Sequence, residues 1–263
     1  MAKISQTLDV VYDATLDLKL DVYYPENQSL LGGIIDVHGG GWFRGDKAKD
    51  ADWATRLANE GFLVVVPNYR ITPAGYYPDP LTDMDHVYDW LKHSDYDFDK
   101  SKIAAVGSSA GGNMTVEMGI KFGIPIVSLS GIIDIEDWLQ HHEAVVAKPD
   151  TTQDFNAASA QIDQTGANDS FYKWFVTNYF NGRTDQYKDA TPYLHVTDQT
   201  GPMYLANSLN EFVPTSGVIS LAETLNVHQI PSTSRFLTGS RHAKGYLDDV
   251  YDETVAFLKR NLA

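Results

Sequence analysis

The chain has 263 residues, a length that one large α/β domain can account for. Apolar residues make up 43 %, an ordinary value for a globular protein with a sizeable core. The net charge of −15 argues against nucleic acid and anionic membranes as partners, and the absence of cysteine excludes disulfides and a cysteine nucleophile. With no membrane-spanning run and no signal-peptide pattern, we expect a cytoplasmic protein.

Eight stretches have the patterns of β-strands. An antiparallel pair is expected over Gln6–Tyr12 and Leu18–Tyr24, because the second stretch alternates apolar and polar residues. The later stretches are short, nearly continuous apolar runs, which are typical of strands covered on both faces of a parallel sheet. These runs are Gly33–Val37, Phe62–Val66, Lys102–Val106, Pro125–Leu129, Met203–Ala206 and Ser234–Leu237.

Helical patterns lie between most of these strands. Leu81–His93 shows the clearest one, with an apolar stripe at helical spacing. The other expected helices are Lys49–Asn59, Asn113–Phe122, Thr215–Leu225 and Asp248–Leu262. Strands that alternate with helices over most of the chain predict a doubly wound α/β fold in one domain, residues 1–263.

Residues 135–195 interrupt this alternation. The stretch contains no strand of the buried type and is rich in aromatic residues, and it is too long for a plain loop. We interpret it as a helical cap, or lid, inserted between two consecutive strands. Its aromatic side chains would form either an apolar wall of a binding pocket or only the small core of the insert itself.

Gly107-Ser108-Ser109-Ala110-Gly111 fits the pattern G-x-S-x-G. The pentapeptide alone is a weak signal, since roughly one chain in ten of this composition would contain it by chance. Its position between a buried strand and a helix gives it meaning, because the sharp turn exposes the central side chain beside free N–H groups of the new helix. Ser109 is therefore the candidate nucleophile. The alternative is a glycine-rich turn without chemistry.

A second glycine-rich turn, His38-Gly39-Gly40-Gly41-Trp42, follows the strand Gly33–Val37. Glycine lets backbone N–H groups point into a site without a Cβ in the way. The amides of Gly40, Gly41 and Ala110 are the candidate oxyanion hole, which would stabilise the negative oxygen of a tetrahedral intermediate. Trp42 is the candidate substrate-binding residue, although packing beside the site is the favoured alternative. His38 is expected to brace the loop.

Together, HGGGW, Asn68-Tyr69-Arg70, Tyr77-Pro78 with Asp83, and GSSAGG resemble the esterase/lipase branch of the α/β-hydrolase superfamily. This branch includes relatives of hormone-sensitive lipase and small bacterial carboxylesterases. The resemblance implies an α/β-hydrolase fold, with a mostly parallel central sheet, helices on both faces and the cap inserted after strand 6. One departure is Ser108, where the hormone-sensitive lipase group usually has aspartate.

The resemblance also implies a catalytic acid and a histidine that follow the serine in that order. His242 lies shortly after the last expected strand and is the candidate general base. Glu211 is the only carboxylate in the turn after Met203–Ala206, so it is the candidate acid. Asn210 occupies a neighbouring position but cannot stabilise an imidazolium as a carboxylate does. The rival acids are Asp134, Asp198 and Asp248.

These residues predict a serine carboxylesterase that hydrolyses small to medium esters through an acyl-enzyme. Such chemistry needs no metal and no cofactor, and the expected partner is a small-molecule ester. Two alternatives are open: an amidase or acylaminoacyl-type peptidase that uses the same triad, and a ligand-binding member of the fold that has lost catalysis. The oligomeric state is left open.

Overall fold

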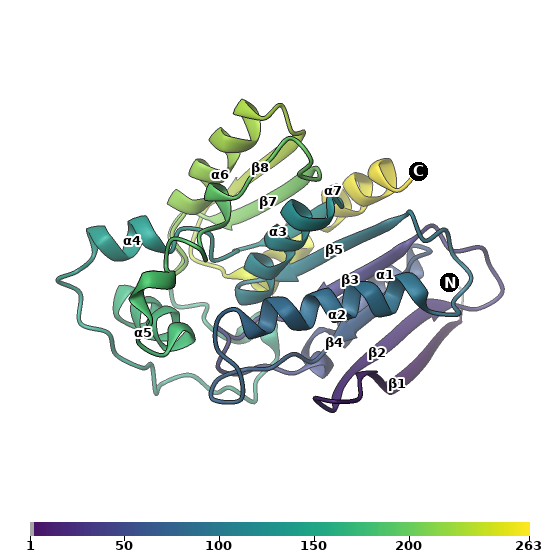
Figure 1. The fold of residues 1–263 in the computed structure, drawn as a ribbon, viewed down its shortest axis with the longest axis horizontal. Helices are drawn as coiled ribbons and strands as arrows, with labels where there is room; N and C mark the ends of the chain where they lie inside the picture. Colours follow the sequence, from purple (N-terminus) through teal and green to yellow (C-terminus); the bar gives the residue numbers. More distant parts are fainter. Residues whose placement is uncertain (1–2) are drawn as a thin grey trace.

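The computed structural model describes residues 3–263, whose strands form one eight-stranded sheet (Figure 1). The strands are β1 (Ile4–Asp13), β2 (Leu18–Pro25), β3 (Gly33–Val37), β4 (Leu63–Pro67), β5 (Ile103–Ser108), β6 (Ile126–Leu129), β7 (Met203–Ser208) and β8 (Ser232–Leu237). The helices are α1 (Ala51–Asn59), α2 (Asp79–His93), α3 (Ala110–Phe122), α4 (Glu136–His141), α5 (Asp169–Phe180), α6 (Ser216–Val227) and α7 (Leu247–Asn261).

The sheet has the order β1-β2-β4-β3-β5-β6-β7-β8. β1 pairs antiparallel with β2, and β2 pairs antiparallel with β4, whereas every pair from β4 to β8 is parallel. The apolar runs occupy the middle of the sheet, where every residue of β3 to β7 is buried. This confirms the predicted fold class, and the carboxyl ends of the parallel strands meet at one edge of the sheet.

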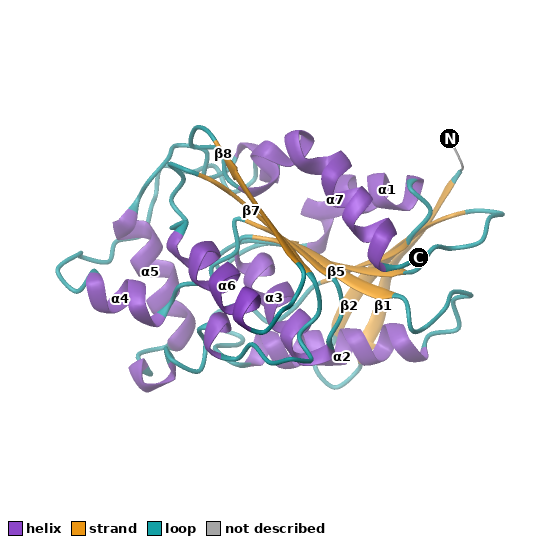
Figure 2. Ribbon diagram, turned by 90° about the horizontal axis from the view of Figure 1, so that it is seen from above, coloured by secondary structure: helices purple, strands orange, loops and turns teal. Residues whose placement is uncertain are grey.

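Helices cover both faces of the sheet (Figure 2). On one face, α1 and α7 pack their apolar stripes against the sheet and form one core cluster with it. On the other face, α2, α3 and α6 belong to a second and larger cluster. Among residues 3–263, no helix combines the length and the apolar character that crossing a membrane requires.

Helix α3, which follows Ser109, begins earlier than predicted, at Ala110 instead of Asn113. Gly111 and Gly112 suggest a loop by their low helix propensity, yet both lie in the first turn of α3. Packing explains them: a Cβ on Gly111 would lie 1.9 Å from the carbonyl oxygen of Val37. Tertiary packing therefore overrides local propensity at this point.

Residues 135–195 connect β6 to β7, as expected, and contain α4 and α5. The part between these two helices is irregular, apart from a short 3-10 turn at Ser159–Gln161. Helix α5 packs its aromatic side chains into the larger core cluster. The insert is therefore joined to the body of the protein through a shared core, beside the carboxyl ends of the strands (Figure 1).

One buried carboxylate lies in the centre of the sheet. Asp36, in β3, is fully buried, and neither of its oxygens has a hydrogen-bond partner in the part of the chain that the structure describes. Burial raises its pKa well above the ordinary value; Asp50 and Asp52 also raise it, whereas Lys244 opposes them. Lys244 is itself buried and donates to Lys49 O at 2.8 Å and to Asp50 Oδ1 at 3.1 Å.

Asp36→Asn should stabilise the fold at neutral and alkaline pH. Because the pKa of Asp36 is raised by folding, its contribution to stability is present below the ordinary carboxyl pKa and is lost as the pH rises toward the folded-state pKa. Denaturant titrations should show a gain in unfolding free energy of about 1–3 kcal/mol at pH 8 that shrinks toward pH 4. The exposed Asp185→Asn is the control, and a variant that is less stable at pH 8 would contradict this account.

Candidate active site

Ser109 stands at the turn between β5 and α3 in a strained backbone conformation. Its φ of 55° and ψ of −119° are unfavourable for a residue with a Cβ. The turn is held by a hydrogen bond from Ser109 N–H to Leu129 O at 2.8 Å and by one from Asn113 N–H to Ser109 O at 3.0 Å. Its side chain lines a cavity above the sheet. This is the geometry predicted for a nucleophile turn.

The second glycine turn packs directly against the first. A Cβ on Gly39 would lie 2.9 Å from Ser108 O and 3.2 Å from Ser109 Cβ. Gly40 and Gly41 have φ values of 125° and 59°, which favour glycine. Within residues 3–263, the amides of Gly40 and Gly41 donate no hydrogen bond. The amide of Ala110 lies at the first position of α3, where a helix leaves its N–H groups without an intrahelical partner. Three N–H groups near Ser109 are thus free for an oxyanion.

His38 braces this loop. Its Nδ1 lies 2.7 Å from Gly39 O, its ring stacks on Tyr69, and the hydroxyl of Tyr69 donates to His38 O at 2.9 Å. Burial lowers the pKa of the imidazole, which favours the neutral form. These contacts support a structural role for His38.

His242 and Glu211 form a buried pair. Nδ1 of His242 is hydrogen-bonded to Glu211 Oε2, and the ring of Phe212 packs against the imidazole with 4.3 Å between the ring centroids. Oε1 of Glu211 accepts two further hydrogen bonds, both at 2.8 Å, from Ser208 N–H and from the hydroxyl of Ser130. Three donors therefore compensate the carboxylate for its removal from water.

Ser130 is a site residue that the sequence did not reveal. It follows β6 with a φ of 52°, and its Oγ accepts a hydrogen bond from Ala243 N–H at 2.8 Å. Its Oγ also lies 2.7 Å from the hydroxyl of Tyr246, which donates to Ala206 O. A serine at the end of a strand carries no motif by itself. The one available signal was its position at the carboxyl edge of the sheet, where Ser109 and Glu211 are also found.

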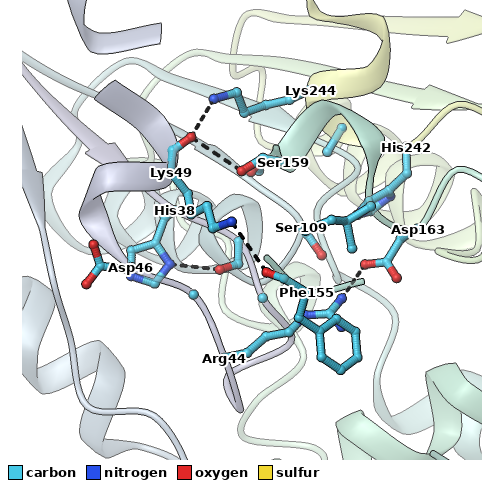
Figure 3. A pocket seen from close by; sticks show the side chains of 16 residues that line it. His38, Arg44, Asp46, Lys49, Ser109, Phe155, Ser159, Asp163, His242 and Lys244 are labelled. Atoms are coloured by element: carbon cyan, nitrogen blue, oxygen red, sulfur yellow. Dashed lines mark hydrogen bonds and ion pairs between the residues drawn. The ribbon is translucent and has the colours of Figure 1, made fainter. Parts of the chain in front are cut away.

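Ser109 and His242 line the same cavity and lie beside each other in Figure 3. Among residues 3–263, no hydrogen bond is recorded between the hydroxyl of Ser109 and the imidazole. Catalytic hydrogen bonds often tighten only when substrate binds. The arrangement brings together all three residues predicted for the triad, from the loops after β5, β7 and β8.

The rival acids lie in other surroundings. Asp134 accepts hydrogen bonds from Trp138 N–H at 3.0 Å and from the hydroxyl of Ser216 at 2.6 Å, so it joins the starts of α4 and α6. Asp198 pairs with His228, and Asp248 pairs with Arg56; both carboxylates are largely exposed. None of the three contacts His242.

The structure does not support Trp42 as a substrate-binding residue. Its side chain is fully buried and does not line the cavity, because its ring stacks on Tyr179 of α5 with 4.1 Å between the ring centroids. The packing alternative is therefore the correct one. Trp42 joins the turn of residues 38–42 to the insert.

Two cavities meet at Ser109. The larger has a volume of about 230 Å³ and is lined by both glycine turns, by residues 242–244 and by part of the insert, including Phe155, Ser159 and Ile162. The smaller, of about 10 Å³, is lined by Gly41, Ser109 and four phenylalanines: Phe43, Phe171, Phe175 and Phe212. The larger cavity can hold much of a small ligand, whereas the smaller one has room only for a group of about the size of a methyl.

An ion pair separates the two cavities. Arg44, which follows the turn of residues 38–42, donates to Asp163 of the insert at 2.5 Å. Both side chains line both cavities (Figure 3). The guanidinium also lies over the ring of Phe155, 4.0 Å from its centroid. Burial raises the pKa of Asp163, whereas Arg44 opposes this rise.

Known proteins with related sequences are named as esterases. A versiconal hemiacetal acetate esterase of Dothistroma septosporum is 31 % identical over 55 % of this chain and 46 % of its own length. A carboxylesterase of Mycobacterium tuberculosis is 27 % identical over 64 % of this chain and 52 % of its own. The chain therefore matches about half the length of these two relatives.

Solved structures with the same fold cover nearly the whole chain. A truncated carbohydrate esterase from gut microbiota has a TM-score of 0.76 and 18 % identity, and covers 98 % of this chain and 96 % of its own. A hyperthermophilic esterase of Pyrobaculum calidifontis has a TM-score of 0.76 and 20 % identity, over 99 % and 84 % of the two chains. The BD-FAE family model matches residues 20–225. The chain therefore belongs to the BD-FAE family and has the α/β-hydrolase fold.

Proposed function

We propose that the protein is a serine carboxylesterase that hydrolyses small carboxylic esters with the triad Ser109, His242 and Glu211. The observation that carries the proposal is the meeting of a strained serine, a carboxylate-bound histidine and free backbone amides at one cavity. The names of the relatives supply independent support, because they describe enzymes that act on esters.

The proposed reaction begins when Ser109 Oγ attacks the ester carbonyl carbon while Nε2 of His242 takes the hydroxyl proton. Glu211 holds the ring through Nδ1–H and stabilises the imidazolium that forms. The negative oxygen of the tetrahedral intermediate is placed at the amides of Gly40, Gly41 and Ala110. His242 then gives its proton to the leaving alcohol, and water releases the acyl group by the same steps in reverse order.

The smaller cavity suggests which part of the ester lies where. It adjoins both Ser109 and Gly41, and phenylalanine side chains line it, so we place a short acyl group there. The alcohol would then occupy the larger cavity, where the polar side chains of Asp46, Lys49 and Ser159 are found. Residues 135–195 supply one side of both cavities, which supports their assignment as a cap over the site.

An amidase that uses the same residues is the second candidate. An arylacetamide deacetylase of Oryctolagus cuniculus is 33 % identical to this chain over 35 % of the chain and 26 % of its own length. Its name describes amide cleavage. Matched acetate ester and acetanilide substrates separate the two activities, and we expect the ester to react faster.

Ser109→Ala should reduce hydrolysis of p-nitrophenyl acetate by at least about 10³-fold, because the covalent step is lost. Ser108→Ala is the matched control, since it removes a neighbouring buried hydroxyl from the same turn and should keep most of the activity. A fluorophosphonate probe should label the wild type and the control but not the Ser109 variant. Undiminished turnover by Ser109→Ala would remove this serine from the mechanism.

Glu211→Gln should lower kcat by about 10²- to 10⁴-fold, because an amide cannot stabilise the imidazolium that His242 becomes. Asp134→Asn is the comparison, since it alters the strongest rival carboxylate, whose contacts are structural. Steady-state kinetics with p-nitrophenyl acetate compares the two variants. A larger loss of kcat in Asp134→Asn than in Glu211→Gln would transfer the role of the acid to Asp134.

The acyl group should be short. With p-nitrophenyl esters, we expect kcat/KM to be highest for acetate to butyrate and to fall about tenfold or more at octanoate, because the small cavity beside Gly41 has no room for a longer chain. Phe171→Ala should relieve this limit, whereas Phe122→Ala, at the far end of α3, should leave the preference unchanged. A wild-type preference for octanoate would contradict this placement of the acyl group.

A further inference from the structure

His242 lies in a loop, so neither a strand nor an α-helix holds its main chain. It lies between β8, which ends at Leu237, and the 3-10 turn Ala243–Tyr246. A histidine that must serve both Ser109 and Glu211 needs its main chain fixed in position. The contacts that fix this main chain come in part from the insert.

Gln164, in the irregular part of the insert, binds the main chain of His242 on both sides. Its Oε1 accepts a hydrogen bond from His242 N–H at 2.8 Å, and its Nε2 donates to His242 O at 3.0 Å. The same Nε2 donates to Ile162 O at 2.7 Å, which holds the carboxamide in this orientation. One side chain thus satisfies the backbone donor and a backbone acceptor of the catalytic histidine.

The absence of a side chain at Gly245 leaves room for the carboxamide of Gln164. A Cβ on Gly245 would lie 2.0 Å from Gln164 Oε1, and its three nearest atoms all belong to Gln164. Gly245 N–H also donates to His242 O, at 2.8 Å. The φ of Gly245 is not in the positive range, so contact with Gln164 is the reason that the structure gives for glycine here.

We propose that Gln164 is a positioning residue for catalysis, which fixes the main chain of His242 so that its imidazole stays aligned with Ser109 and Glu211. The insert would then complete the catalytic site in addition to covering it. This inference rests on the proposed esterase function. Gln164 touches neither the reacting atoms nor either cavity, so it acts only through His242.

The test compares Gln164→Ala with Gln161→Ala, which removes an exposed glutamine from the same insert. With p-nitrophenyl acetate, Gln164→Ala should lower kcat about 10- to 100-fold and leave KM within about twofold, because alignment is lost and substrate contacts are kept. Gln161→Ala should match the wild type. A kcat of Gln164→Ala within twofold of the wild-type value, or a loss confined to KM, would overturn the inference.

Gly245→Ala provides a second test from the other side of the contact. The added methyl group displaces the carboxamide of Gln164, so this variant should show the same loss of kcat. In the Gln164→Ala background, Gly245→Ala should cause almost no further loss, because the group that it displaces is gone. Additive losses in the double variant would show that the two residues act separately and would contradict the proposal.

Gln164→Glu keeps an acceptor for His242 N–H but no amide donor for His242 O, so its kcat should lie between those of the wild type and Gln164→Ala. This variant also decides the matter if Gln164→Ala does not fold. If the proposed esterase function is wrong, the result is different, because the wild type itself would hydrolyse no ester and bind no fluorophosphonate. Wild-type activity with full kcat in Gln164→Glu and Gly245→Ala would contradict the positioning role alone.

Discussion

The two glycine-rich turns, residues 38–42 and 107–111, pack so closely that only glycine fits between them. A Cβ on Gly111 would clash with the carbonyl oxygens of Val37 and His38. A Cβ on Gly39 would crowd Ser108 and the Cβ of Ser109. Parallel pairing of β3 with β5 brings the two turns to the same edge of the sheet. The strain at Ser109 is maintained by this packing, so the proposed nucleophile and its oxyanion amides are positioned by one set of contacts.

The hydrogen bonds to the buried carboxylate of Glu211 are a second constraint on the site. Glu211 is almost inaccessible to solvent, and its carboxylate receives hydrogen bonds from His242, Ser130 and Ser208 N–H. These donors come from the loop after β8, from the residue after β6 and from the last residue of β7, so a single carboxylate links three neighbouring strand ends. In the proposed mechanism, the same bonds keep the carboxylate directed at the imidazole. Gln164 would extend this support from the insert to the backbone of His242.

The sequence predicted the fold well, because its signals were local and strong. The apolar run Gly33–Val37 coincides with β3, and the other strands lie within two residues of their expected limits. The glycine motifs placed the two turns, since each required a conformation or a contact that glycine alone allows. Ser130 and Gln164 could not be predicted, because their roles depend on contacts between residues more than seventy positions apart. For Trp42 the sequence left substrate contact open beside the favoured packing role, because it did not show that α5 supplies Tyr179 as a stacking partner.

The central claim is that Ser109 carries the acyl group between the two halves of the reaction. Rapid acid quenching during turnover of p-nitrophenyl acetate, followed by peptide mapping with mass spectrometry, tests it most directly. The account predicts a burst of p-nitrophenol and one acetyl group on Ser109, and the acetylated fraction should fall as substrate is exhausted. Steady turnover with no acetylated serine, or with the acetyl group on another residue, would contradict it.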